Sequence, residues 1–321
     1  MNTIPQTMQA WVLHGYGGAE AMRFETVAVP QPRPGELLLR VEAASVNPAD
    51  WKIRAGLLQA VLPVTFPRVP GRDGVGTVVS LGAGCDGFAV GQRVHAVADA
   101  LRDGIHAEFT VVAGAMAAPV PPSLPVADAA CLGVAGLSAW IPLVEIAALR
   151  PGQRVLIHAG AGGVGGLAIQ IARHMGAEVL ATCGTANVDY CMSLGAHQVI
   201  DYIRERFELV AAGCDVVFDT IGGDVHRRSF DVLKPGGLLV HLTAAPIDTM
   251  DTTDPLPRRA DVRVVRAEIR ASTARLVKLL EWARAGFIRP QVGRSFPLAE
   301  ANAAYALSAG GHMRGKILLR V

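Results

Sequence analysis

The stretch RVLIHAGAGGVGGLAIQIARHMG, residues 154–176, decides the fold of this chain. Its apolar, β-branched start is typical of a buried strand, and from Val164 its apolar residues recur at helical spacing. Between the two stand Gly160, Gly162 and Gly165 in the pattern G-x-G-x-x-G. Glycine there permits a tight turn and a close backbone approach to a pyrophosphate, which the N-terminus of the following helix attracts. The stretch therefore predicts a dinucleotide-binding turn, against the alternative of a glycine-rich turn without a ligand.

Strand and helix patterns alternate around this turn, which is typical of a parallel sheet with crossover helices. The expected elements are, in order, 154–158, 163–175, 178–182, 187–194, 198–200, 215–219, 224–233, 237–242, 262–268 and 272–285.

The first third of the chain has a different pattern, with short β-rich runs separated by Gly and Pro. These runs, and a similar one at the C-terminus, cover residues 10–13, 36–43, 76–81, 93–97, 108–112 and 316–321. A proline-rich stretch, PVPPSLP at 119–125, marks the seam between the two patterns. We therefore expect an α/β protein with a β-domain over 1–124 and 270–321 and a doubly wound domain over 125–269.

Composition excludes several classes of protein. The 321 residues are 51% hydrophobic and 18% charged, which is typical of a globular chain with a large core. A net charge of +2 without a basic run gives no case for nucleic acid. Residues 131–149 are long and apolar, but Pro142 and Glu145 favour a buried helix over a membrane span. Five scattered cysteines and the absence of a signal-peptide pattern at the start predict a reducing, cytoplasmic location.

Four motifs carry a family resemblance: NPADWKIRAG at 47–56, PGRDGVG at 70–76, HAGAGGVG at 158–165 and RGKI at 314–317. In this order they resemble the zinc-free quinone oxidoreductase branch of the medium-chain dehydrogenase/reductase superfamily, which includes NADPH-dependent enone reductases. The resemblance implies a GroES-like, partly open β-barrel domain, a Rossmann domain and an active site in the cleft between them. It also implies a homodimer that pairs the edge strands of two Rossmann sheets.

The expected site has no metal. Zinc-dependent relatives carry Cys where this chain has Asn47, and His-Glu where it has Arg72 and Asp73. Arginine does not ligate zinc and Asn is a poor ligand for it. Without a Lewis acid to acidify an alcohol, hydride transfer to an already electrophilic acceptor is the easier chemistry.

The candidate catalytic residues are Lys52 and Asn47. The resemblance places Lys52 beside the nicotinamide, where its ammonium can stabilise an oxyanion; the alternative is a solvated loop lysine. The Asn47 amide can donate to a substrate carbonyl or simply hold the turn before Pro48. Trp51 and Phe66 line an apolar substrate pocket or pack in the core. Two charged pairs, Asp50 with Arg54 and Arg72 with Asp73, are expected as local structural ion pairs.

The expected cofactor is NADPH, because no acid follows the second strand of the doubly wound domain to hold a free ribose hydroxyl. No Arg or Lys follows that strand closely either, so hydroxyl and amide groups are the candidates for the phosphate side. The cofactor-binding candidates, including Lys316 from the last motif, are Gly160, Gly162, Gly163, Val164, Gly165, Gly184, Thr185, Asn187, Tyr190, Tyr202, Gly223, Thr243 and Lys316.

These observations lead to one main hypothesis, an NADPH-dependent reductase of small quinones or α,β-unsaturated carbonyls that uses no metal. Two alternatives stay open. The first is a nucleotide-binding or redox-sensing protein with little catalysis. The second is an enoyl-thioester reductase, which needs a cationic groove for its substrate arm that Arg258 and Arg259 are too slight to establish.

Overall fold

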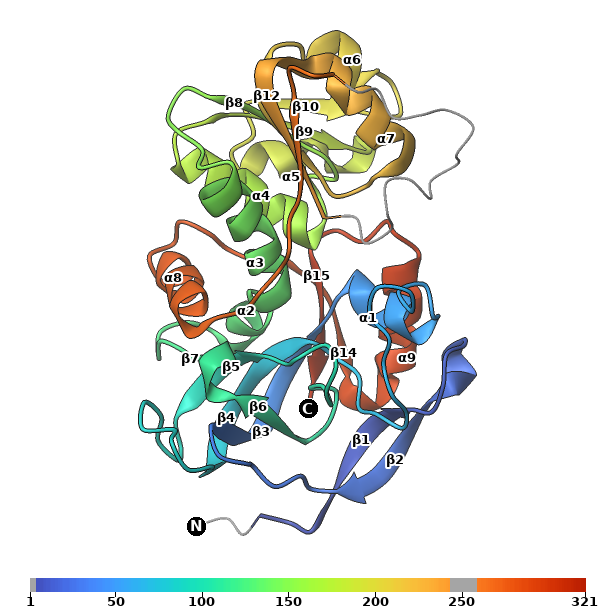
Figure 1. The fold of residues 1–321 in the computed structure, drawn as a ribbon, viewed down its shortest axis with the longest axis vertical. Coiled ribbons are helices and arrows are strands. Elements are labelled where there is room, and N and C mark those ends of the chain that lie inside the picture. The colour runs from blue at the N-terminus through green and yellow to red at the C-terminus, as the bar shows by residue number, and fades with distance from the viewer. Residues whose placement is uncertain (1–3, 243–258) are drawn as a thin grey trace. The chain divides into compact units, whose positions relative to one another are not determined.

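The computed structural model describes residues 4–242 and 259–321. The chain divides into two compact units (Figure 1). The first comprises Met1–Leu137, Arg270–Gly286 and Pro290–Val321, and the second comprises Ser138–Ile269 and Phe287–Arg289. The expected fold class is confirmed: a GroES-like β-unit accompanies a Rossmann-like unit with a parallel sheet.

The first unit is built mainly of antiparallel strands. A hairpin joins β1 (Thr7–Leu13) to β2 (Met22–Ala28). The larger sheet has the order β14-β15-β3-β4-β5-β7, with β6 paired to β3. Its strands are β3 (Glu36–Val46), β4 (Asp73–Leu81), β5 (Arg93–Val97), β6 (Phe109–Ala113), β7 (Ala117–Pro119), β14 (Val292–Pro297) and β15 (Lys316–Arg320). The C-terminal strand β15 runs antiparallel to β3, with Ile317 opposite Val46.

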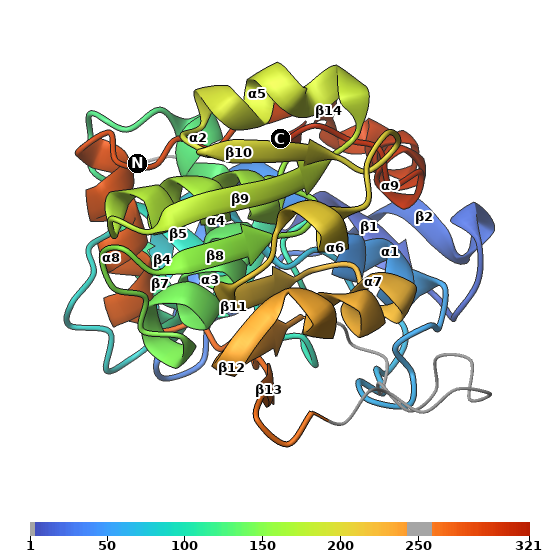
Figure 2. The ribbon, with the colours of Figure 1, turned by 90° about the horizontal axis from the view of Figure 1, so that it is seen from above.

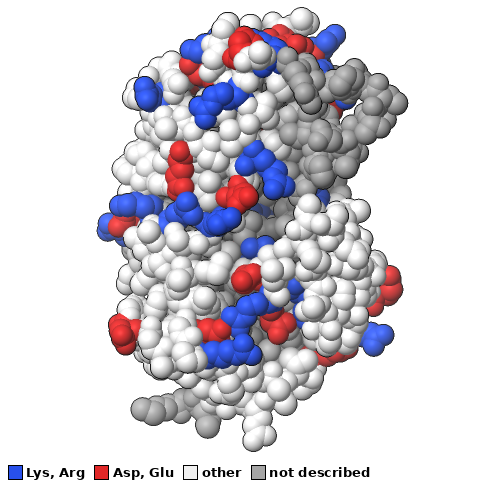
Figure 3. All heavy atoms as spheres, in the orientation of Figure 1, with Lys and Arg blue, Asp and Glu red and all other residues white. Residues whose placement is uncertain are grey.

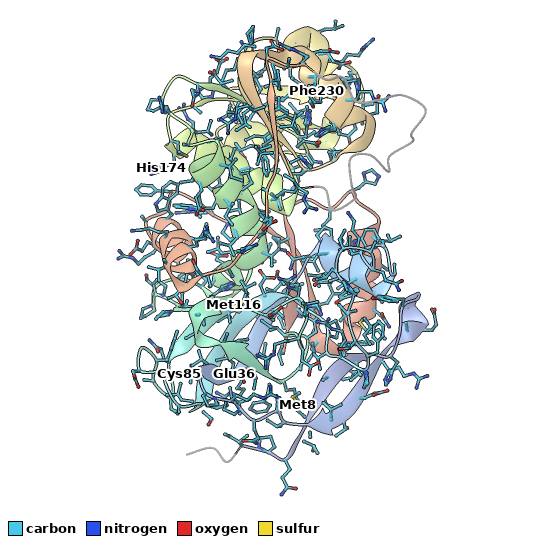
Figure 4. All side chains as sticks on the ribbon, viewed as in Figure 1. Met8, Glu36, Cys85, Met116, His174 and Phe230 are labelled. Carbon is cyan, nitrogen blue, oxygen red and sulfur yellow. The ribbon has the colours of Figure 1, made fainter. Side chains whose placement is uncertain are left out.

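The first unit also contains helices, and helix α9 packs against its core. They are α1 (Pro48–Arg54), α2 (Val126–Ala130), α8 (Thr273–Arg284) and α9 (Ala301–Ala309). Helix α9 buries Ala301, Ala304 and Tyr305, at the spacing that places residues on one helical face. Glu36 and Cys85, labelled in Figure 4, are in contact in this unit, where the Cys85 thiol donates to the Glu36 backbone carbonyl. All five cysteines of the chain are buried, and no disulfide joins any of them within the described residues.

The second unit is a six-stranded parallel sheet of order β10-β9-β8-β11-β12-β13 (Figure 2). Its strands are β8 (Arg154–Ile157), β9 (Glu178–Cys183), β10 (Gln198–Asp201), β11 (Cys214–Asp219), β12 (Leu233–His241) and β13 (Arg263–Arg266). The accompanying helices are α4 (Gly163–His174), α5 (Val188–Ser193), α6 (Phe207–Val210) and α7 (Gly223–Arg228). The strand order reverses between β8 and β11, the place where such folds bind ligands at the strands' carboxyl ends.

The core of this sheet explains its continuous apolar strands. Leu156, Leu180, Val217 and Leu239 come from four neighbouring strands and have no exposed surface. Strands covered by helices on both faces are apolar throughout rather than alternating. Phe230, labelled in Figure 4, packs in the same core.

The apolar segment 131–149 forms α3 (Gly133–Trp140) followed by a π-helical turn over Ile141–Ile146. Pro142 lies at the start of that turn. Among the described residues, none of the helices combines the length and the apolarity that crossing a bilayer requires.

Candidate cofactor and active site

The glycine loop has the form that a dinucleotide requires. A Cβ on Gly165 would lie 2.1 Å from the Ala159 carbonyl oxygen, and one on Gly160 would lie 2.9 Å from the Ala181 Cβ. These two glycines are therefore needed for packing within the protein. A Cβ on Gly162 would meet only the Ala159 oxygen, at 3.4 Å. The protein itself therefore leaves space at Gly162, where the backbone can come close to a bound pyrophosphate.

The N-terminus of α4 follows directly. Gly162 is its N-cap, in extended conformation, and no side chain caps the helix. The first turn also contains no acidic residue. The N–H groups of Gly163, Val164 and Gly165 precede the first intrahelical bond, which Gly166 donates to Gly162, and so remain available to an anion. Four predicted residues thus form one cradle, and the residues present fit a pyrophosphate.

His158, at the start of this loop, is a buried positioning group. Its Nδ1 lies 3.1 Å from the Thr182 hydroxyl and its Nε2 lies 3.0 Å from the Ser229 hydroxyl. The Ser229 hydroxyl donates its proton to the Val225 carbonyl, so its oxygen accepts from the His158 Nε2–H. The unprotonated Nδ1 of His158 then accepts from the Thr182 hydroxyl. Burial lowers the pKa of His158 to about 4. The ring is therefore neutral and fixes where the loop leaves β8.

A second loop, after β11, is held by a buried carboxylate. Asp219 accepts from the N–H groups of Ile221 and Gly222, at 2.8 and 2.9 Å, and from His226 Nδ1 at 2.7 Å. Burial by itself raises the pKa of Asp219, but the His226 bond and the two N–H groups outweigh it and leave the pKa lowered. Gly222 and Gly223 have φ values of +82° and +59°, which favour glycine. The predicted residue Gly223 thus lies in a loop shaped by Asp219 and His226, which the sequence analysis did not select.

The adenosine-side candidates gather at the ends of β9 and β10. The Tyr202 hydroxyl lies 3.2 Å from a Cβ built on Gly184, so it covers that glycine. Thr185 donates its hydroxyl to Asp201 Oδ2 at 2.6 Å, which leaves it as an acceptor only.

The other two candidates of this side lie at and within α5. Asn187 donates its backbone N–H to the Gly184 carbonyl, and the Tyr190 hydroxyl packs 3.3 Å from a Cβ built on Gly166 of α4. Thr243, the remaining candidate of this unit, lies outside the described residues.

In the first unit, Asn47 is fully engaged. Its Nδ2 donates to Asp73 Oδ1 at 2.7 Å and to the Ser45 hydroxyl at 3.3 Å. Its Oδ1 accepts from the buried Lys316 ammonium at 2.6 Å, which also donates to the Val46 carbonyl at 3.1 Å. The structure thus brings together two predicted residues, Asn47 and Lys316, that are far apart in sequence. Both ends of the amide have protein partners, which makes Asn47 a fixed link between an ammonium and a carboxylate.

Both expected local ion pairs are wrong. Asp50 Oδ2 accepts from the Asn47 N–H at 2.7 Å, and Arg54 instead donates to Asn302 and lies over the Tyr305 ring at 5.2 Å. Sequence spacing of i, i+4 does not pair them because Asp50 turns back to cap α1.

Arg72 and Asp73 are likewise not paired. Arg72 donates to the Ala98 carbonyl, and Asp73 accepts from Ser45, Asn47 and the Val134 N–H. Adjacent strand residues point to opposite faces, which separates the two side chains.

Lys52 differs from these residues. It is half-buried, its ammonium lies 5.6 Å from the centre of the Trp51 ring, and no hydrogen bond to it exists within the described residues. Trp51 and Phe66 are half-buried and pack against the core of the unit. Phe66 also packs edge-on against the ring of Tyr16, with 4.8 Å between the ring centres. Tyr16 is not among the residues that the sequence predicted for the site. Lys52 is therefore a cation with its donors available, beside an aromatic surface.

In residues 4–242 and 259–321, no three or more His, Cys, Asp or Glu side chains come together as a possible metal group. Figure 3 shows Lys and Arg mixed with Asp and Glu over the face in view, in keeping with the small net charge.

Comparison with known proteins decides the family. Residues 33–122 match the alcohol dehydrogenase GroES-like domain, and residues 194–319 match the zinc-binding dehydrogenase family. The chloroplast envelope quinone oxidoreductase homolog of Arabidopsis thaliana is 32% identical over 97% of this chain and 98% of its own length. This chain belongs to the quinone and enone oxidoreductase branch of the medium-chain dehydrogenase/reductase superfamily. The resemblance stated from the four motifs is confirmed.

Further relatives agree with this membership. The chloroplastic NADPH-dependent alkenal/one oxidoreductase of A. thaliana is 33% identical over 99% of this chain and 80% of that protein. The quinone oxidoreductase structure from Coxiella burnetii superposes with a TM-score of 0.89, at 30% identity, over 98% of this chain and 99% of that chain. A mycobacterial protein solved in complex with NADPH has a TM-score of 0.83 at 29% identity, over 98% and 100% of the two chains. The protein is an oxidoreductase with a nicotinamide cofactor and a small-molecule substrate.

The expected cytoplasmic location is wrong. The two A. thaliana relatives are named as chloroplast proteins, and the mouse NAD(P)H oxidoreductase RTN4IP1, 30% identical over 98% of this chain and 89% of its own length, is named as mitochondrial. Scattered cysteines that form no disulfide within the described residues indicate only a reducing compartment, and the cytosol is one of several such compartments.

Proposed function

We propose that this oxidoreductase uses NADPH to reduce quinones or α,β-unsaturated carbonyls and needs no metal for the transfer. The observation that carries the proposal is the contrast between Asn47 and Lys52. Asn47, at the position of a zinc ligand in zinc-dependent relatives, has both ends of its amide bonded to Lys316 and Asp73. The Lys52 ammonium, which lies over the Trp51 ring, has no hydrogen bond to any of the described residues. The site is thus suited to charge stabilisation by a donor rather than by a Lewis acid.

The mechanism needs few groups from the protein. NADPH held by the glycine loop, Gly160 to Gly165, would supply the hydride that the electrophilic carbon accepts. Lys52 donates a hydrogen bond to the acceptor oxygen, on which negative charge develops. Asn47 acts as a positioning residue, because its links to Lys316 and Asp73 hold the start of α1, the helix that carries Lys52. Solvent supplies the proton that completes the reduced product.

The binding roles follow from the two units. Gly160, Gly162, Gly163, Val164 and Gly165 form the pyrophosphate cradle. Four residues that follow β9, lie in α5 or follow β10 form the adenosine side, namely Thr185, Asn187, Tyr190 and Tyr202, and Gly223 belongs to the loop held by Asp219. Trp51 and Phe66, with Tyr16, form the apolar wall for the acceptor.

The preference for NADPH over NADH rests on the end of β9, where no free carboxylate stands. Asp201, the acid at the end of the neighbouring strand β10, has both oxygens bonded within the protein. We also propose that the enzyme is a homodimer, formed through the edge strand β13, which pairs only with β12 in the described sheet. Light scattering on the purified protein tests the dimer: a monomeric mass at micromolar concentration contradicts it.

The function is tested by NADPH oxidation with a short conjugated enone and, in parallel, with a quinone. We expect acceptor-dependent oxidation that yields the saturated ketone or the hydroquinone, in enzyme with less than stoichiometric zinc by metal analysis. Turnover that depends on one bound zinc per chain contradicts the metal-free reaction. Tight NADPH binding without turnover on either acceptor contradicts the reductase.

A further inference from the structure

The carboxyl ends of β9 and β10 form a polar corner in the second unit (Figure 2). Asp201, the last residue of β10, lies opposite Cys183, the last residue of β9. The Tyr202 N–H donates to the Cys183 carbonyl at 3.1 Å, which continues the pairing by one residue. The residues after each strand therefore lie side by side. In Rossmann folds this corner faces the adenosine ribose, where an acid holds a free 2′-hydroxyl and an arginine accommodates a 2′-phosphate.

A single carboxylate organises this corner. Asp201 Oδ2 accepts from the Thr185 hydroxyl at 2.6 Å and lies 3.5 Å from Arg204 Nε. Its Oδ1 accepts from the Ile203 N–H at 3.0 Å. Asp201 is itself only 6% exposed. Both oxygens of this nearly buried acid are therefore already bonded within the protein, and its Oδ2 contacts both Thr185 and Arg204.

Arg204 keeps most of its donors free. Its side chain is 73% exposed, and the Asp201 contact is its one ion pair within the described part of the chain. A guanidinium has five N–H groups in a planar fork, so one long contact leaves the rest for an anion. The Tyr202 hydroxyl, which covers Gly184, provides a second donor at the same corner. The next arginine along the chain, Arg206, is different, because its guanidinium donates to Glu208 at 2.8 Å.

We propose that Arg204 is the residue that selects NADPH, by binding the 2′-phosphate with its guanidinium while Tyr202 donates from the other side. This inference rests on the proposed use of NADPH. Asp201 is the positioning residue, since it fixes both Thr185 and Arg204 beside the end of β9. The cation that the segment after β9 lacks therefore comes from the neighbouring strand.

The test uses binding of two fragments to the full chain by calorimetry: 2′,5′-ADP, which carries the 2′-phosphate, and 5′-AMP, which does not. In Arg204→Ser we expect the Kd for 2′,5′-ADP to rise about 10- to 100-fold, the range for loss of charge-assisted hydrogen bonds. The Kd for 5′-AMP stays within about twofold. Arg204→Lys keeps part of the affinity, because the charge remains but the fork is lost.

Arg206→Ser is the matched control: it removes the same charge two residues away, from a guanidinium already paired with Glu208. We expect it to bind both fragments like the wild type. Equal losses in the two serine variants indicate diffuse charge only and overturn the proposal. So does an unchanged Kd for 2′,5′-ADP in Arg204→Ser, or a wild type that binds both fragments equally.

Kinetics separate this inference from the proposed function. If the enzyme reduces enones, kcat/KM with NADPH falls in Arg204→Ser by the same factor as fragment affinity, and kcat/KM with NADH does not fall. If the wild type binds 2′,5′-ADP selectively through Arg204 but reduces no acceptor, the reductase proposal fails and the phosphate site stands. The exposed position of Arg204 predicts an unchanged unfolding midpoint, which checks that each variant is folded.

Discussion

Two buried carboxylates, one in each unit, show how differently the same group can be used. Asp219 in the Rossmann-like unit accepts three hydrogen bonds, and its pKa is lowered despite complete burial. Asp50 in the GroES-like unit accepts one hydrogen bond, from the Asn47 N–H, and its buried Oδ1 has no hydrogen-bond partner among the described residues. Burial, and then the repulsion of Asp73, raise the pKa of Asp50 to about 7, although Arg72 and Lys316 act in the opposite direction. The number of donors, not burial, decides which carboxyl stays charged.

The largest expected effect is a pH-dependent difference between Asp50→Asn and the wild type. A raised folded pKa means that the folded state holds a proton that the unfolded chain releases, so this group's contribution falls as pH rises from about 4 through 7. The two proteins should be equally stable near pH 4, and the variant should be more stable by up to about 4 kcal/mol near pH 8.

Urea unfolding of both proteins across this range gives that difference directly. Subtracting the two curves removes the buried histidines His106, His158 and His241, whose lowered pKa values make stability rise with pH in the same window. A difference that does not change with pH contradicts the account of Asp50.

The second prediction concerns Asp219→Asn, the counterpart in the other unit. The variant loses a charge that is hydrogen-bonded three times and places an amide N–H against His226. We expect a loss of about 2 to 3 kcal/mol in unfolding free energy, nearly constant from pH 5 to 8 because the pKa of Asp219 lies below that window. If Asp219→Asn has the same unfolding free energy as the wild type at pH 7, the proposed difference between the two carboxylates is wrong.

The third prediction separates two glycines of one loop. Gly165→Ala places a Cβ against the Ala159 carbonyl, so we expect a loss of about 1 to 3 kcal/mol in stability. Gly162→Ala finds only an ordinary contact, so its stability should match the wild type while its affinity for NADPH falls about tenfold. Thermal unfolding measures the stability of both variants, and fluorescence titration measures their affinity for NADPH. A Gly162→Ala variant that loses stability but keeps its affinity for NADPH argues against the cradle.

The two units also differ in how much of each could be predicted from the sequence. The unit around 154–176 was predicted because its strand, glycine loop and helix are local, and their periodicity is visible in a short window. The strands β2 and β14 were missed, since their residues are largely half-buried or exposed and show no apolar run. The fold class followed from the change of pattern along the chain.

The candidate site was less visible. Lys316 contacts Asn47 only because β15 pairs with β3, and Asp201 reaches Thr185 only through the register of β9 and β10. Such contacts depend on strand pairing, which sequence spacing does not encode. Glycine positions, by contrast, follow from backbone requirements and could be listed in advance.

The measurement that tests the central claim most directly is turnover of Lys52→Met with NADPH and a conjugated enone. Methionine keeps the length of the side chain but removes its donors, so we expect kcat to fall about 10²- to 10³-fold. The Kd for NADPH should stay within about twofold of the wild type. Lys278→Met, which removes an exposed ammonium paired with Glu281, is the control and should keep full activity. Unchanged turnover in Lys52→Met contradicts the account.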